Sequence, residues 1–367
     1  MNRRTFLEHG VGLSAGLLTV GAPRAARWAA AATADNKWRT FEVVTRVEPA
    51  APSGVTRVWV PVPLMTETDY FKRLGDTWKG NAASSKLHRD ERYDAGLVYA
   101  EWTAAEKAPV LEVVSRFSTR DRAVDLSKPP AGTSREDAAL LKKYLQATDL
   151  IPTDGIVLET AQGIVKGETT EVGKAKAIYE WIVDNTFRDP KTKGCGLGDI
   201  RTMLETRYLG GKCADLNALY VGLARSVGLP ARDVYGVRVA DSAEFRSLGK
   251  SGDISKAQHC RAEVHLTGYG WVPVDPADVR KVVLEEKPGG PIPLTDPQVV
   301  KARAKLFGAW EMNWLAYNYA HDVKLPGSDG KPIPFLMYPQ GETANERKDS
   351  LDPTSFKYTI SSKEITG

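Results

Sequence analysis

Cysteine is scarce in this sequence of 367 residues, which contains only three, at positions 195, 213 and 260. Three cysteines cannot form the dense disulfide framework that holds small secreted domains together. They allow one functional thiol and at most one disulfide, for which the candidate pair is Cys195 and Cys260. Three unpaired thiols are an equally good interpretation, because the sequence does not show whether those two residues approach each other.

The sequence also lacks a hydrophobic run long enough to cross a membrane, and it has no basic cluster interleaved with aromatic residues. It contains neither a phosphate-binding loop motif nor a calcium-binding loop motif. We therefore expect no nucleic-acid partner, no membrane span in the mature protein, and no cofactor.

The first 34 residues have the composition of an export signal. Two adjacent arginines, Arg3 and Arg4, precede an apolar run at 11–20, and an A-x-A cleavage pattern ends at Ala34. The paired arginines resemble the twin-arginine signal of bacteria, so we expect an exported, periplasmic protein that begins near Asp35. An uncleaved anchor is the alternative, which the short and glycine-interrupted run disfavours. Removing the signal lowers the net charge from +4 to about +1.

The remaining residues divide into three parts by composition. Residues 35–128 are predicted to form an all-β sandwich, because short apolar segments alternate with turns. A linker rich in proline and glycine at 128–132 opens the second part, residues 129–300, which is mostly helical before a predicted hairpin. Residues 301–367 carry aromatic, strand-like segments and are expected to extend the second part. The alternating segments of the first part lie at 39–48, 56–62, 96–102 and 110–119.

Cys213 begins the most distinctive predicted helix. Two glycines and Lys212 precede it, apolar residues follow at helical spacing, and Gly228 and Pro230 end the helix. A thiol in the first turn meets unpaired N–H groups and the positive end of the helix dipole, which both favour the thiolate. The alternative is a buried cysteine with a purely structural role.

A predicted β-hairpin supplies a base and an acid for that thiol. The chain alternates from His259 to Leu266, turns at two glycines, and returns from Trp271 to Asp275. If the turn is centred on the glycines, Leu266 faces Trp271 and His259 lies opposite the residues just after Asp275. A cysteine nucleophile needs a base for its proton, and that base needs an acceptor that fixes its tautomer.

Three segments of the sequence, 211–219, 228–232 and 259–275, together resemble the bacterial transglutaminase-like superfamily. The first reads Gly-Lys-Cys-Ala-Asp-Leu-Asn-Ala-Leu, the second Gly-Leu-Pro-Ala-Arg, and the third ends in Gly-Trp-Val-Pro-Val-Asp, with Pro276 after it. The resemblance implies an α+β fold with a papain-like core, in which a cysteine-bearing helix packs on an antiparallel sheet behind the β-sandwich.

The same resemblance implies that Cys213 is the nucleophile, that His259 is the general base and acid, and that Asp275 orients His259. The expected chemistry is acyl transfer through a thioester, with hydrolysis of amide or peptide bonds as the first choice. Protein-glutamine transglutamination is an alternative, because the triad is common to both reactions. The expected partner is a protein or peptide, such as a cell-wall peptide. A different class, a non-catalytic envelope-binding protein with a vestigial triad, would have an unshifted thiol pKa.

The family hairpin commonly carries other residues at the positions of Cys260, Arg261 and His265. Arg261 could pair with Glu263 or Asp275, or it could bind a carboxylate of the substrate. His265 shares a strand face with His259, but the motif assigns the base to His259.

Two further interpretations concern residues near the nucleophile. Tyr208 is a candidate oxyanion donor beside the Cys213 N–H, although it could equally be a core residue. A zinc site built from Cys213, His259, Cys260 and His265 is disfavoured, because the closely spaced ligand pairs of structural zinc sites are missing. We therefore expect no bound metal.

Overall fold

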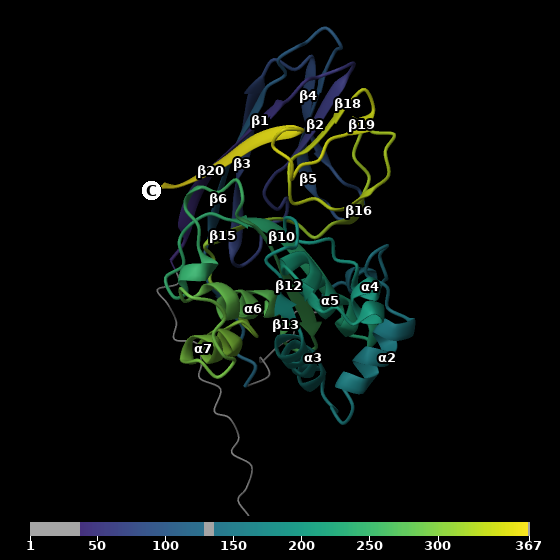
Figure 1. Cartoon of the computed structure of the whole chain (residues 1–367), viewed down its shortest axis with the longest axis vertical. Helices are drawn as coiled ribbons and strands as arrows, with labels where there is room; N and C mark the ends of the chain where they lie inside the picture. Colours follow the sequence, from purple (N-terminus) through teal and green to yellow (C-terminus); the bar gives the residue numbers. More distant parts are fainter. Residues whose placement is uncertain (1–36, 128–135, 366–367) are drawn as a thin grey trace, which may run out of the picture.

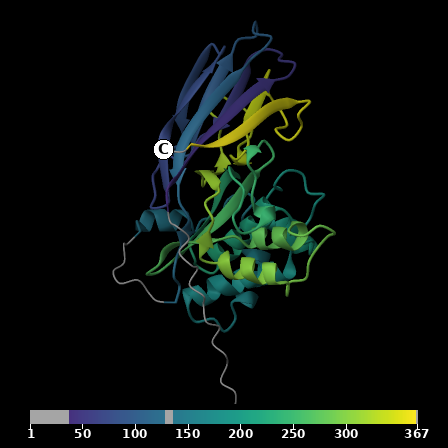
Figure 2. The same ribbon diagram turned by 90° about the vertical axis from the view of Figure 1, so that its left-hand side faces the viewer.

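A computed structural model describes residues 37–127 and 136–365. The chain forms a β-sandwich at one end and a body of helices around a sheet at the other (Figures 1 and 2). The predicted export signal at 1–34 and the predicted linker at 128–132 lie outside the described residues. No helix within the described ranges combines the length and apolar character that a bilayer crossing requires.

The sandwich consists of two antiparallel five-stranded sheets, with strand orders β11-β20-β1-β6-β3 and β19-β18-β2-β5-β4. Inward-facing side chains such as Val47, Val58, Val98 and Val113 come from both sheets and form one apolar cluster. The strands are β1 (Arg39–Pro49), β2 (Thr56–Pro61), β3 (Phe71–Gly80), β4 (Ser84–Arg89), β5 (Gly96–Trp102), β6 (Leu111–Thr119), β11 (Gly252–Asp253), β18 (Gln340–Thr343), β19 (Glu346–Arg347) and β20 (Phe356–Ile365).

The C-terminal region, which we expected to extend the helical part, is divided between the two halves of the molecule. β15 (Trp314–Asn318) does join the sheet of the helical part. β20 instead pairs with β1 from Pro49 opposite Phe356 to Thr40 opposite Ile365, and β18 pairs with β2. The physical reason is that β1 and β2 each expose an edge whose backbone groups need a partner, and the C-terminal strands provide it.

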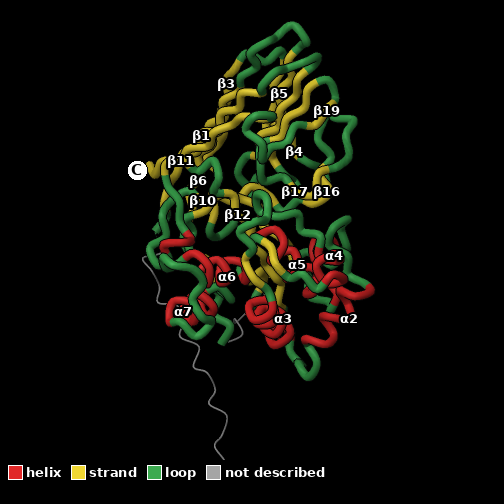
Figure 3. The backbone as a smooth tube through the Cα atoms, in the orientation of Figure 1, coloured by secondary structure: helices red, strands yellow, loops and turns green. Residues whose placement is uncertain are grey.

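The second half is built around an antiparallel sheet with the order β13-β12-β10-β15. Most of the helices gather on the side of this sheet away from the sandwich (Figure 3). The sheet strands are β10 (Ala231–Arg238), β12 (Gln258–Leu266), β13 (Gly270–Val274) and β15. The helices are α1 (Ala138–Lys143), α2 (Gly155–Ile164), α3 (Glu171–Asn185), α4 (Ile200–Thr206), α5 (Cys213–Ser226), α6 (Pro276–Glu285) and α7 (Pro297–Lys305). Short pieces complete it: β7 (Arg122–Ala123), β8 (Phe187–Arg188), β9 (Gly210–Gly211), β14 (Ala309–Trp310), β16 (His321–Val323), β17 (Ile333–Phe335) and a 3-10 turn at Arg246–Leu248.

The two faces of this sheet pack against different parts of the molecule. On one face, Cys260, Ala262 and Val264 of β12 share a core with the apolar side of α5. On the other face, Val234 and Val237 of β10 pack in a cluster that includes aromatic residues of the sandwich. The expected α+β class, with a cysteine-bearing helix on an antiparallel sheet behind a β-rich region, is confirmed.

The hairpin differs from the prediction by one residue in register. Trp271 pairs with His265, and Leu266 pairs with Gly270, so the turn is one residue tighter than expected. Tyr269 N donates to Leu266 O within this turn, at 2.9 Å. His259 still lies at the open end of the hairpin, where β13 leads into Asp275.

Candidate active site

Cys213 is the first residue of α5, directly after the N-cap residue Lys212. The Asp215 carboxylate, one turn into the helix, accepts the N–H of Lys212 at 2.9 Å. It also accepts the N–H groups of Leu197 and Gly198, each at 2.9 Å. These three bonds fix the start of the helix against the loop that precedes α4, so the Cys213 thiol is held at the positive end of the helix dipole. The Ala214 N–H of the same turn donates to Cys195 O at 2.9 Å.

His259 and Asp275 meet as the hairpin predicted. The Nε2 atom of His259 donates to Oδ2 of Asp275 at 2.7 Å. Asp275 is also the N-cap of α6, where its Oδ1 accepts the N–H of Asp278 at 3.0 Å. One carboxylate therefore caps a helix and orients an imidazole, which leaves Nδ1 of His259 as the nitrogen available to the thiol.

Sequence analysis missed two polar residues of this network. The Oδ2 atom of Asp278 lies 3.3 Å from His259 Nε2, and its Oδ1 accepts a hydrogen bond from Arg238 at 2.6 Å. Asn217 donates to Asp275 Oδ1 at 3.2 Å. Spacing could have indicated both residues, since Asp278 lies three positions after the helix cap and Asn217 lies one helical turn after the nucleophile.

The charges around His259 favour the imidazolium form. Burial lowers the pKa of His259, and so does the charge of Arg238. The carboxylates of Asp278 and Asp275 outweigh both effects and raise the pKa of His259 to about 10. Burial opposes ionisation of Asp278, but Arg238 and His259 lower its pKa well below the usual range. Burial and the charge of Asp278 raise the pKa of Asp275.

The three cysteines gather at this site as free thiols, so the candidate disulfide between Cys195 and Cys260 is not formed. Hydrogen bonds from Cys195 and then Cys260 lower the pKa of the Cys213 thiol, as does a hydrogen bond from His259, against an opposing effect of burial. The result is a pKa well below the usual range. A thiolate beside an imidazolium is the ionisation state that a cysteine nucleophile requires.

The site is closed to bulk solvent. Cys213 and His259 are each 3% exposed, and Asp275 is 0% exposed. Tyr338 packs over the cysteine-bearing loop, where its hydroxyl accepts the N–H of Cys195 at 2.9 Å. A peptide can therefore reach the Cys213 sulfur only when neighbouring side chains move.

Tyr208 is not available as an oxyanion donor in this structure. Its side chain is 53% exposed, and its hydroxyl donates to Asp189 Oδ2 at 3.1 Å. Its ring packs edge-on against Phe187, with ring centroids 5.4 Å apart. Because the hydroxyl proton is already engaged by a carboxylate, the prediction for Tyr208 is not supported by the geometry.

Arg261 lies beside Asp275 rather than beside Glu263. Its Nε atom is 3.7 Å from Asp275 Oδ2, and its Nη1 donates to the carbonyl oxygen of Glu311 at 3.0 Å. The guanidinium carbon also lies 4.8 Å from the ring centroid of Trp314. Only 3% of the side chain is exposed, so Arg261 stabilises the network from within and is not accessible to a substrate.

His265 occupies the opposite end of β12 from His259. Its ring packs edge-on against Trp271, with centroids 5.4 Å apart, and burial lowers its pKa. The hairpin therefore brings His259, and not His265, to the carboxylate of Asp275.

The cysteines and histidines do not form the zinc-type cluster that was considered above. Across residues 37–127 and 136–365, the only group with suitable spacing is His259, Asp275 and Asp278, whose ligand atoms lie within 4.8 Å of one another. Arg238 donates to Asp278, and Arg261 lies beside Asp275. These two guanidinium groups oppose a cation at that position.

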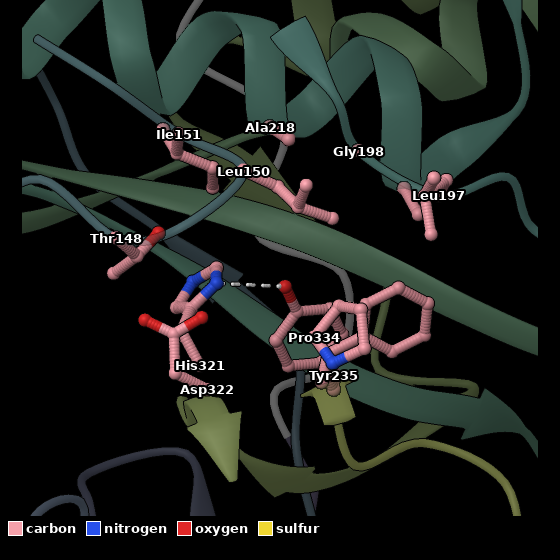
Figure 4. A pocket seen from close by; sticks show the side chains of 12 residues that line it. Thr148, Leu150, Ile151, Leu197, Gly198, Ala218, Tyr235, His321, Asp322 and Pro334 are labelled. Carbon is pink, nitrogen blue, oxygen red and sulfur yellow. Dashed lines mark hydrogen bonds between the residues drawn. The ribbon is translucent and has the colours of Figure 1, made fainter. Parts of the chain in front are cut away.

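A second histidine lies in a small cavity beside α5 (Figure 4). The cavity measures about 10 Å³, which is room for about one water molecule. Nδ1 of His321 lies 3.4 Å from the Tyr235 hydroxyl, and its Nε2 lies 3.2 Å from Asp233 Oδ2. The cavity is too small for a substrate, so His321 is a buried residue of the protein interior.

Comparisons with known proteins show which proteins this chain is similar to. A family model described as the transglutaminase-like superfamily matches residues 158–276. An uncharacterized protein of Haemophilus influenzae is 35% identical over 344 residues, covering 89% of this chain and 90% of that protein. A crystal structure of a candidate cysteine protease from Cytophaga hutchinsonii covers 89% of this chain and 98% of its own, with 15% identity and a TM-score of 0.49. The periplasmic domain of TgpA from Pseudomonas aeruginosa covers 65% of this chain and 87% of its own, with 14% identity and a TM-score of 0.35.

Proposed function

Residues 158–276 match the transglutaminase-like superfamily, and on that premise we propose that the chain is a cysteine enzyme that cleaves amide or peptide bonds through a thioester on Cys213. The observation that carries the proposal is the 2.7 Å hydrogen bond between His259 and Asp275 at the start of α6, with the Cys213 thiol against the same imidazole. A lowered thiol pKa and a raised imidazole pKa support the same assignment.

In the first step, the Cys213 thiolate attacks the carbonyl carbon of the substrate and forms a C–S bond. The oxyanion faces the Cys213 N–H at the start of α5, where the helix dipole stabilises negative charge. His259 then gives its Nδ1 proton to the leaving nitrogen, and the C–N bond breaks. Asp275 and Asp278 stabilise the imidazolium before this transfer and hold the ring in place through Nε2.

In the second step, an acceptor resolves the thioester. His259 takes a proton at Nδ1 from the acceptor, whose oxygen or nitrogen attacks the carbonyl as the C–S bond breaks and the thiolate reforms. Water as the acceptor gives hydrolysis, whereas a primary amine gives transglutamination. Cys213 is only 3% exposed, so the closed site limits the access of water to the thioester. This observation favours transglutamination as a second candidate.

We also propose that the protein is exported through a twin-arginine signal. The support is the Arg3-Arg4 pair, the apolar run that follows, and the cleavage pattern that ends at Ala34. A protein or peptide of the cell envelope is then the proposed substrate. Mass analysis of the N-terminus of the exported protein tests this, and a chain that retains Arg3 and Arg4 would contradict it.

The decisive experiment is product analysis on a panel of peptides and glutamine donors, with and without an added primary amine. Release of free acid in both conditions supports hydrolysis, and incorporation of the amine supports transglutamination. No turnover on any donor, combined with a thiol that alkylates with an ordinary pKa of about 8.5, would favour a non-catalytic binding protein instead.

A further inference from the structure

All three cysteines of the chain meet at the candidate active site, although they come from distant segments. Cys195 lies in the loop that precedes α4, Cys213 begins α5, and Cys260 lies within β12. They are free thiols that are 7%, 3% and 0% exposed, respectively. Cleavage of an amide bond through a thioester needs one thiol only. The proposed reaction therefore leaves two buried thiols whose role is not explained by catalysis.

Cys195 lies directly against the nucleophile. Its carbonyl oxygen accepts the N–H of Ala214, the residue after Cys213, at 2.9 Å, so the two backbones are adjacent. The Cys195 thiol lies within hydrogen-bonding reach of the Cys213 sulfur and 3.3 Å from the carbonyl oxygen of Gln258. A disulfide requires adjacent backbones and sulfur atoms that can approach each other. Small side-chain rotations would bring the sulfurs of Cys195 and Cys213 into contact.

Cys260 is less suited to such a bond, although it also lies within hydrogen-bonding reach of the Cys213 sulfur. Its backbone belongs to a sheet strand, where it pairs with Tyr235 of β10. Its carbonyl oxygen also accepts a hydrogen bond from Asn217 at 2.9 Å. These contacts hold the backbone of Cys260 in place, whereas Cys195 lies in a loop. Cys195 is therefore the better disulfide partner for Cys213.

The ionisation of the two thiols and the closed site favour the same pair. The pKa of Cys213 is well below the usual range, so its sulfur is the one that an oxidant attacks. The hydrogen bond with Cys213 and burial raise the pKa of Cys195 well above its usual value, so Cys195 stays a thiol. Hydrogen peroxide is little larger than water and can enter where a peptide cannot. Larger external thiols are excluded in the same way, which leaves Cys195 as the thiol at hand.

We propose that Cys195 is a resolving cysteine, which forms a disulfide with Cys213 after a peroxide has oxidised the nucleophile. The inference rests on the proposed function, in which Cys213 is the nucleophile, and it adds a means of regulation to that site. The disulfide removes the nucleophile reversibly. It also prevents further oxidation of Cys213 to the sulfinic and sulfonic acids, which simple thiols do not reduce.

The reaction has two steps. The Cys213 thiolate attacks one oxygen of hydrogen peroxide, so that an S–O bond forms and the O–O bond breaks. The hydroxide that leaves takes a proton from the His259 imidazolium and becomes water. The Cys195 sulfur then attacks the Cys213 sulfur, so that the S–S bond forms and the S–O bond breaks. The leaving hydroxide and the Cys195 proton combine as a second water, and the two electrons lost by the thiols reduce the peroxide.

Peroxide treatment of the full chain tests the proposal. The protein is treated with hydrogen peroxide, blocked with iodoacetamide, and analysed by intact mass and peptide mapping, before and after dithiothreitol. We expect the loss of two hydrogen atoms, a peptide that links Cys195 to Cys213, and recovery of Cys213 alkylation after reduction. Addition of oxygen to Cys213 without a link would overturn the proposal, and so would a link that involves Cys260.

A matched pair of variants, Cys195→Ala and Cys260→Ala, tests which thiol resolves the oxidised nucleophile. After peroxide, dithiothreitol should restore Cys213 alkylation almost fully in Cys260→Ala and to less than about a tenth in Cys195→Ala. Equal recovery in the two variants would overturn the proposal. Circular dichroism checks that each variant is folded, and the peptide map of the unmodified protein decides if either one is not.

These measurements follow Cys213 itself and need no substrate, so they separate the disulfide from the proposed reaction. A Cys195–Cys213 link in a protein that turns over no donor would support the resolving role and count against the proposed function. Turnover in a protein that forms no such link would overturn the resolving role alone.

Discussion

Two buried histidines, His259 and His321, each lie against a carboxylate, yet their surroundings differ. The Nε2 atom of His259 is 2.7 Å from Asp275, and that of His321 is 3.2 Å from Asp233. The difference is at the other ring nitrogen. A thiol is available to His259, whereas Nδ1 of His321 lies against the Tyr235 hydroxyl. A histidine and a carboxylate are therefore not sufficient for catalysis, because the second nitrogen must face a nucleophile.

The largest expected effect is that of removing the nucleophile. Cys213→Ala should lower turnover by about 10⁴-fold or more on any substrate found in the donor panel, because no other group can form the thioester. The measurement is product release at saturating substrate, with the folded state checked by circular dichroism. Turnover that persists in a folded Cys213→Ala protein would contradict the assignment of Cys213 as the nucleophile. The access of His259 to this thiol would then no longer distinguish it from His321.

Separate substitutions of His259 and His321 test whether only His259 has a catalytic role. His259→Gln should lower turnover by about 10²- to 10⁴-fold, since it removes general acid and base catalysis. His321→Gln should leave turnover nearly unchanged and lower the free energy of unfolding by about 1 kcal/mol, through loss of buried polar contacts. Activity assays and urea denaturation of both variants provide the measurement. Equal losses of activity would mean that His321 has a catalytic role.

The two carboxylates beside His259 should differ in their effects. Asp275→Asn should lower turnover by about 10²-fold or more, because the short bond that sets the imidazole tautomer is lost while asparagine still caps α6. Asp278→Asn should lower turnover by about tenfold, since it removes the longer contact to His259 and the charge that pairs with Arg238.

The pH profile separates these two roles. With one negative charge fewer, the imidazolium is less stable, so the pKa of His259 should fall below its value of about 10 in the unmodified protein. The alkaline limit of activity in Asp278→Asn should therefore move to lower pH. An unmoved limit would show that Asp278 does not act on His259.

The smallest effect concerns the thiols around Cys213. Alkylation by iodoacetamide should rise with pH through a Cys213 pKa well below about 8.5 and then remain level, because only the thiolate reacts. Cys195→Ala should shift this curve to higher pH by up to about one pKa unit, since one hydrogen bond to the sulfur is lost. Cys195→Ser, which retains a donor, should shift it less. A curve that does not move would mean that Cys195 does not stabilise the thiolate.

The sequence predicts most local elements of this fold. It does not predict strands with polar side chains or strands whose partners are distant in the sequence. β1 and most of β6 alternate between buried and more exposed positions, which the apolar pattern indicates, and β2 and β5 are buried at all but one position. β3 and β4 were missed because both are edge strands with mostly polar, exposed side chains. β18 and β20 pair with β2 and β1, which lie hundreds of residues earlier in the chain, so no local pattern identifies these pairings.

Prediction of the site likewise succeeds for residues in local sequence patterns and fails for residues placed by tertiary packing. The positions of Cys213, His259 and Asp275 follow from one helix start and one hairpin, which are local patterns. Tyr208 was chosen for its closeness in sequence to Cys213, yet its hydroxyl is bound by Asp189. Asp278 was overlooked because its contact depends on how α6 leaves the hairpin, and that geometry comes from tertiary packing.

The pairing of β20 with β1 has a consequence for synthesis of the protein on the ribosome. While the chain grows, β1 can pair with β6, but its other edge remains open until residues 356–365 emerge. The nascent sandwich therefore carries an unprotected, aggregation-prone edge for nearly the whole of translation. Deletion of the last strand would leave this edge open in the finished protein, so we expect the truncated product to form inclusion bodies.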